Sequence, residues 1–134
     1  MVKKDIINKA GVVLYRESHN GNVEVLLISA RRHKGSWVFP VGTVEEHETL
    51  QVAAARECKE ESGYIVEVED EVGTVKTLNG DVADYYTFYK AGVLNKTDEY
   101  EKDRTIKWVI PDELPETVAE IFRPIAEAFI RGLK

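Results

Sequence analysis

The chain has 134 residues, of which 43% are hydrophobic and 31% are charged, and this is enough for one core in one domain spanning residues 1–134. Its formal net charge of −6 argues against a nucleic-acid scaffold, because such proteins gather Lys and Arg against phosphates. We therefore expect a small-molecule partner. A single cysteine excludes an internal disulfide, no apolar run approaches a membrane span of ~20 residues, and the start of the chain leads into no signal-peptide core. A cytoplasmic location is the expectation.

Short apolar runs predict strands in the first part of the chain. Residues 10–15 and 23–30 are two such runs, separated by polar turn residues. Residues 37–39 form a third, brief extended segment, which the following Pro40 prevents from continuing as a central strand. A loop is expected over residues 41–48.

The middle of the chain predicts a β-hairpin. Residues 65–78 carry apolar residues among acids and predict one long strand or a bent pair, and residues 82–94 predict another strand. Asn79 and Gly80 between them are typical of a hairpin turn.

The last part predicts a short strand and a helix. Residues 106–110 alternate between apolar and polar, and apolar residues at helical spacing predict a helix over 117–133, in which Pro124 starts or kinks the main segment. Together with a helix over 49–62, this order indicates an α/β fold, a mixed sheet with helices on both faces.

The helix over 49–62 carries acids at informative positions. Thr49 is a suitable N-cap and Gly63 a suitable left-handed C-cap. With Glu57 at 0° on a helical wheel, Glu61 lies at about 40° and Glu60 at about 300°. Glu57 and Glu61 therefore point toward the arc of the apolar residues.

Two carboxylates on a buried arc need a positive partner. Like charges four residues apart on a helix repel by a few tenths of a kcal/mol, and burying an unpaired carboxylate costs far more. A hard divalent cation such as Mg²⁺ removes the repulsion and also binds phosphate oxygens. The alternative is a solvated charged face, and the pair of Arg56 and Glu60 at i and i+4 fits it.

The fixed positions in this stretch are Gly42, Glu48, Arg56, Glu57, Glu60, Glu61 and Gly63. Their spacing resembles the signature of the Nudix hydrolases, and the resemblance extends from about Gly11 to the last helix. It implies an α/β/α sandwich and a Mg²⁺- or Mn²⁺-dependent enzyme that cleaves a diphosphate linked to another group.

The resemblance also implies a metal site. Glu57 and Glu61 would bind the metal directly, Glu60 would assist, and the carbonyl of Gly42 would complete the site.

The resemblance also implies a structural ion pair, and this sequence differs from the Nudix signature at two positions. Arg56 and Glu48 would form an ion pair that orients the loop against the helix. Pro40-Val41-Gly42 lacks the first glycine of the usual Pro-Gly-Gly, and His47 replaces a glycine before the glutamate, although positive φ is uncommon outside glycine. His47 is either an exposed loop residue or a group that reaches a phosphate.

Metal-assisted hydrolysis needs a carboxylate that takes the proton of the attacking water. The candidates for this base, or for a further metal ligand, are Glu45, Glu60, Glu99, Glu101 and Asp103. A solvated charged loop is the alternative for the last three.

Substrate contacts are predicted near the end of the second strand. Arg31, Arg32 and Lys34 would suit a polyphosphate tail, or they form a cationic turn on an acidic protein. Tyr86 could stack a base, with packing in its strand as the alternative. Residues 25–46 resemble the branch of the family that hydrolyses diadenosine and diphosphoinositol polyphosphates.

The leading hypothesis is metal-dependent hydrolysis of a phosphoanhydride bond in a nucleoside polyphosphate, such as the dinucleotide diadenosine tetraphosphate. A nucleoside triphosphate pyrophosphatase or an ADP-sugar hydrolase is the alternative. A nucleotide-sensing module without turnover is a different class, and such modules usually lose a metal-binding glutamate that this chain retains. Short family members are often dimers, and the sequence is compatible with both a homodimer and a monomer.

Overall fold

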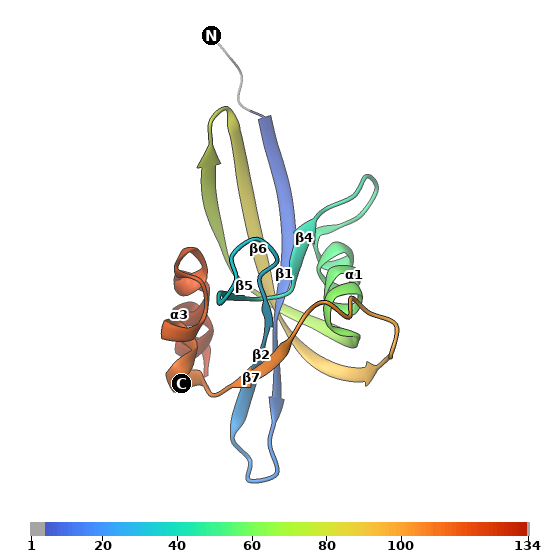
Figure 1. Ribbon diagram of the computed structural model, residues 1–134, viewed down its shortest axis with the longest axis vertical. Coiled ribbons are helices and arrows are strands. Elements are labelled where there is room, and N and C mark those ends of the chain that lie inside the picture. The colour runs from blue at the N-terminus through green and yellow to red at the C-terminus, as the bar shows by residue number, and fades with distance from the viewer. Residues whose placement is uncertain (1–4, 134) are drawn as a thin grey trace.

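The computed structural model describes residues 5–133, and in it a mixed seven-stranded sheet lies between helices (Figure 1). The chain start, from which no signal peptide is expected, lies outside the described residues. The strands are β1 (Asp5–Glu17), β2 (Val23–Ser29), β3 (Trp37–Val38), β4 (Val41–Thr43), β5 (Tyr64–Asn79), β6 (Val82–Lys96) and β7 (Ile106–Val109). The helices are α1 (Leu50–Ser62), α2 (Leu114–Thr117) and α3 (Arg123–Gly132), with 3₁₀ turns η1 (Pro111–Glu113) and η2 (Glu120–Phe122).

The sheet is mixed because one of its strand pairs is parallel. Its order is β3-β2-β1-β6-β5, with β4 paired with residues 9–11 of β1 and β7 paired with β2. Strands β1 and β6 run parallel, and the other pairs are antiparallel. Asn79 and Gly80 lie at the tight turn between β5 and β6, as predicted.

Alternating residues of the central strands fill two separate cores, one on each face of the sheet. Val12, Leu14 and Leu26 pack with Ala54 and Cys58 of α1. The core under α2 and α3 is formed by strand residues that point to the other face and by residues of the C-terminal helical segment. It includes Val13, Leu27, Phe39, Phe88, Leu114, Phe122, Ile125 and Phe129. Figure 1 shows α1 and α3 on opposite sides of the sheet, which confirms the predicted α/β/α sandwich.

Three predicted boundaries were wrong. Strand β1 extends well beyond residues 10–15, because strand pairing rather than burial holds its exposed ends: residues 5–9 pair with β6, and Arg16 and Glu17 pair with β2. The expected loop at 41–48 begins with β4, which pairs with β1. The expected helix over 117–133 is interrupted by η2, and α3 begins only at Arg123, with Pro124 in its first turn, where a missing N–H costs nothing.

None of the helices in the described part of the chain is long and apolar enough to cross a membrane.

Candidate active site

Helix α1 carries the candidate site, and both of its ends are capped as predicted. The Thr49 hydroxyl accepts a hydrogen bond from the Val52 N–H at 3.1 Å. Gly63 ends the helix with φ of 82° in the left-handed region, where glycine avoids the steric cost of a Cβ. These caps fix the rotation of the acidic residues about the helix axis.

Arg56 lies at the centre of four carboxylates. Its Nε and Nη2 donate to the two oxygens of Glu48 at 2.7 and 2.8 Å, a bidentate pair. Its Nη1 lies 2.8 Å from Glu57, 3.3 Å from Glu60 and 3.6 Å from Glu45. The hydrogen bond from Arg56, and then one from the Glu45 N–H, lowers the pKa of Glu48 to about 2.

Glu61 is buried in the wall of the site, as its position on the helical wheel predicts. It is 4% exposed, and one oxygen accepts from the Val41 N–H at 3.1 Å. Arg104 Nη2 is its nearest cationic group, at 4.0 Å. Burial, followed by the neighbouring Glu57 carboxylate, raises the pKa of Glu61 to about 9. The side chain therefore lies where a cation would stabilise its charged form.

The backbone at Gly42 lies directly against the Glu57 carboxylate. A Cβ added at Gly42 would overlap the Glu57 carboxyl group, so any larger residue there would displace that group. Strand β4 thus brings a backbone segment and α1 brings its glutamates to the same point.

These residues suit a hard divalent cation by the chemistry of their donors. Glu57, Glu60 and Glu61 offer carboxylate oxygens on one side of α1, and Glu61 lacks a close cationic partner. Within residues 5–133, no three His, Cys, Asp or Glu side chains converge as metal ligands. Arg56 is ion-paired with both Glu57 and Glu60.

The acidic loop before β7 is tied to arginines. Glu101 lies 2.7 Å from Arg31 and 3.2 Å from Arg104, and Asp103 lies 3.4 Å from Arg31. Glu99 is exposed. Of the three candidates for a base or ligand in this loop, Glu101 is therefore the one linked, through Arg104, to the surroundings of Glu61.

A cavity of about 450 Å³ opens beside Glu61, with basic and aromatic residues in its walls. Arg31, Arg32 and Tyr86, three of the residues predicted to contact the substrate, line it. Tyr86 also packs against Phe122 in a T-shaped arrangement, with 5.2 Å between ring centroids, and Lys9 Nζ lies 5.4 Å from its ring centroid.

Two of the predicted substrate residues lie outside this cavity. Lys34 lines a neighbouring cavity of about 270 Å³. His47 has φ of 71°, the positive value expected for its position, and its side chain is 90% exposed beside Glu46.

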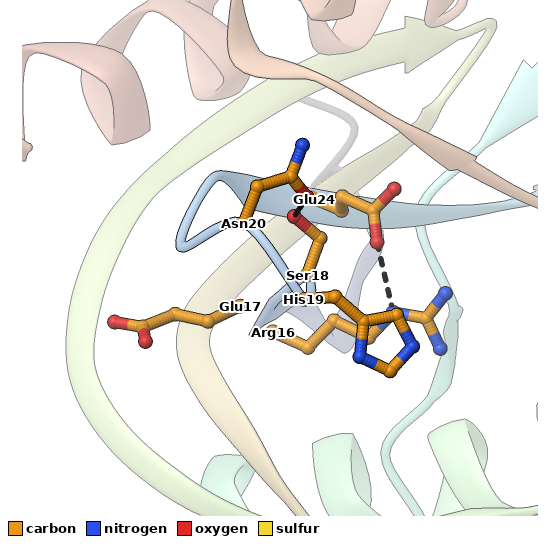
Figure 2. A pocket seen from close by; sticks show the side chains of 6 residues that line it. All are labelled: Arg16, Glu17, Ser18, His19, Asn20 and Glu24. Carbon is orange, nitrogen blue, oxygen red and sulfur yellow. Dashed lines mark hydrogen bonds and ion pairs between the residues drawn. The ribbon is translucent and has the colours of Figure 1, made fainter.

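A separate cavity of about 480 Å³ lies at the turn between β1 and β2 (Figure 2). Its wall includes Arg16, whose Nε lies 3.1 Å from Glu24, and it contains no residue of α1. The cavity beside Glu61 is therefore the one that belongs to the candidate site.

Arg104 was not predicted from the sequence. It lies 43 residues beyond Glu61 and belongs to no spacing pattern, so only the pairing of β7 with β2 brings it to the site. The available signal was weak, namely one basic residue directly after an acidic segment and before a strand.

Comparison with known proteins decides the family. The NUDIX domain profile matches residues 7–129, which is most of the chain. The chain belongs to the Nudix family. This confirms the predicted family and enzyme class, a hydrolase acting on phosphoanhydride bonds, and Nudix enzymes generally use divalent metal ions.

Three known proteins show what this chain is similar to in sequence or in fold. A MutT-like protein of Streptomyces ambofaciens is 32% identical over 117 residues, covering 87% of this chain and 71% of that protein. An 8-oxo-(d)GTP phosphatase of Mycolicibacterium smegmatis is 35% identical over 80 residues, covering 54% of this chain but only 24% of that protein. The crystal structure of a C. elegans Ap4A hydrolase binary complex has the same fold, with a TM-score of 0.77, 22% identity, and coverage of 95% of this chain and 97% of that one.

Proposed function

We propose that residues 1–134 form one Nudix domain that hydrolyses a dinucleoside polyphosphate, such as diadenosine tetraphosphate. The observation that supports this most directly is the cavity beside Glu61, in which arginines and an aromatic ring adjoin an acidic helix face. Cationic side chains suit the phosphate chain, and the ring of Tyr86 suits a base. The fold shared with the C. elegans Ap4A hydrolase is consistent with the proposal.

The glutamates of α1 would hold Mg²⁺ or Mn²⁺. Glu57 and Glu61 would bind it directly, with Glu60 assisting and the Gly42 carbonyl completing the site. The bound ion supplies charge neutralisation at the diphosphate and lowers the pKa of water. Arg56 and Glu48 would keep the β4 to α1 loop in position for this.

Glu60 is our choice for the carboxylate that takes the proton of the attacking water. Its side chain is 51% exposed and has one ion-pair contact, at 3.3 Å from Arg56, so it can reorient toward a water. Glu101 is more constrained, because two arginines contact it. Glu45, Glu99 and Asp103 stay alternatives.

The substrate is tested by the products released with Mg²⁺ from a panel of diadenosine tetraphosphate, nucleoside triphosphates and an ADP-sugar. Release of a nucleoside triphosphate from diadenosine tetraphosphate is the expected result. If only nucleoside triphosphates react, giving monophosphate and pyrophosphate, the proposal is wrong. The second candidate, a nucleoside triphosphate pyrophosphatase, then applies, as the similarity to the 8-oxo-(d)GTP phosphatase suggests.

The homodimer, the cytoplasmic location and the absence of nucleic-acid or membrane partners stay predictions from the sequence.

A further inference from the structure

Arg104 lies in the wall of the candidate active-site cavity, at the end where Glu61 also lies. Its side chain is 11% exposed, which is low for an arginine on a short strand connection. Two of its three nitrogens are occupied. Nη1 donates to the Ser29 carbonyl at 2.8 Å, and Nε donates to Glu101 at 3.2 Å.

These two contacts anchor the guanidinium to separate parts of the fold. Ser29 is the last residue of β2, and its hydroxyl also accepts from the Thr105 N–H at 2.9 Å. The Glu101 N–H donates to the Glu60 carbonyl of α1 at 2.9 Å. The planar group is therefore held between the sheet and the acidic helix, and its orientation is set before any ligand arrives.

The third nitrogen, Nη2, is the one nearest to Glu61. It lies 4.0 Å from Glu61, which is too far for a hydrogen bond, and no hydrogen bond from Nη2 to another described residue is present. A buried guanidinium edge with free N–H groups at a cavity wall is well suited to bind a phosphate oxygen.

Arg31 is less suited to this role at the same end of the cavity. Its side chain is 52% exposed, and it is paired with both Glu101 and Asp103. Arg31 also leaves one nitrogen, Nη1, without a hydrogen bond to a described residue, but water screens a phosphate contact at this exposed side chain more strongly than at Arg104, which is 11% exposed.

We infer that Arg104 binds a non-bridging oxygen of the substrate diphosphate through Nη2, opposite the glutamates of α1. The inference rests on the proposed function for the presence of a diphosphate at this site. Its guanidinium contributes hydrogen-bond donors and takes part in no proton transfer. It stabilises negative charge on the phosphate with a donor that needs no reorganisation.

Calorimetric titration of inorganic pyrophosphate in the presence of Mg²⁺ tests this without turnover. Arg104→Met should weaken pyrophosphate binding by about 10- to 100-fold, the range of a lost hydrogen bond to a charged group. The affinity for Mg²⁺ alone should not fall, because the loss of a positive charge beside Glu61 adds no repulsion toward the cation. Arg16→Met is the matched control, since Arg16 contacts Glu24 at the distant cavity of Figure 2, and it should bind pyrophosphate like the unmodified protein.

Arg104→Lys keeps the test decisive if Arg104→Met does not fold. Lysine has a single side-chain nitrogen, and when that nitrogen contacts Ser29 and Glu101 it cannot also stand at the position of Nη2, so pyrophosphate binding should again weaken at least tenfold, about the lower end of the same range. Unchanged pyrophosphate affinity in a folded Arg104 variant overturns the inference, and so does an equal loss of Mg²⁺ and pyrophosphate binding. The titration measures binding and the product panel measures turnover, so failure of the substrate proposal would appear only in the product panel.

Discussion

Arg56 allows four glutamates to gather on one side of α1 before any metal binds. Its guanidinium contacts Glu48, Glu57, Glu60 and Glu45, so their mutual repulsion is reduced by one shared positive charge. Glu61 lies outside this group and is buried. A cation at the site would therefore pair with Glu61 and compete with Arg56 for Glu57.

Glu48→Gln should remove a pH-dependent part of the stability. The folded protein lowers the pKa of Glu48 to about 2 from an ordinary value of 4.5, so the stabilisation is complete above about pH 4.5 and is lost as the pH falls toward 2. Urea unfolding at pH 7 should show the variant to be less stable than the unmodified protein. The difference should shrink by pH 3, and a difference that stays constant with pH would contradict the assignment.

Gly42→Ala should damage the site more than the fold. The new Cβ would overlap the Glu57 carboxyl group, so we expect a cost of about 1–3 kcal/mol in unfolding free energy and a lower affinity for Mg²⁺. Gly132→Ala is the control, because nothing lies within 4 Å of a Cβ at that position. Mg²⁺ titration calorimetry compares the two variants, and equal Mg²⁺ affinity would exclude the close contact at Gly42.

At the residue scale, helical geometry predicted the glutamates of α1 but not Arg104. The angle between Glu57 and Glu61 follows from their spacing alone, and the burial of Glu61 agrees with it. The contact between Glu61 and Arg104 depends on where β7 pairs in the sheet, which no local pattern encodes.

Helix α1 is the element that positions the site, and its N-cap residue, Thr49, determines where the helix begins. Thr49→Ala removes the hydrogen bond to the Val52 N–H and should lower the unfolding free energy by about 1 kcal/mol. Thr49→Ser keeps the acceptor and should recover most of that loss. Denaturant unfolding of both variants checks this, and equal stability of the two would contradict a capping role.

Elements that rest on local chemistry were predicted more accurately than those that rest on tertiary pairing. The limits of α1 follow from Thr49 and Gly63, and the structure has them as expected. Strand β4 was missed because its residues pair with β1 rather than showing a pattern of their own. The predicted last helix is too long at its start, because the apolar spacing continues through η2, whereas α3 begins next to Pro124.

At the scale of the whole molecule, the sheet separates two cores and brings opposite charges to one site. Helix α1, which packs on one core, contributes the Glu61 carboxylate to the cavity, and the segment after β2 contributes Arg31 and Arg32. A protein with net charge −6 thus presents a locally basic cavity to a polyphosphate.

The central claim is that the glutamates of α1 form a metal-dependent hydrolytic site. Its most direct test is the Mg²⁺-dependent kcat of Glu57→Gln on the best substrate of the panel, with circular dichroism as the check on folding. Glutamine keeps the size of the side chain and an acceptor for Arg56, which lies 2.8 Å from Glu57, but removes the charge that would bind Mg²⁺. We predict a fall in kcat of at least about 100-fold, of the order seen when one key transition-state contact is lost, with an unchanged fold. An unchanged kcat in the folded variant would contradict the account.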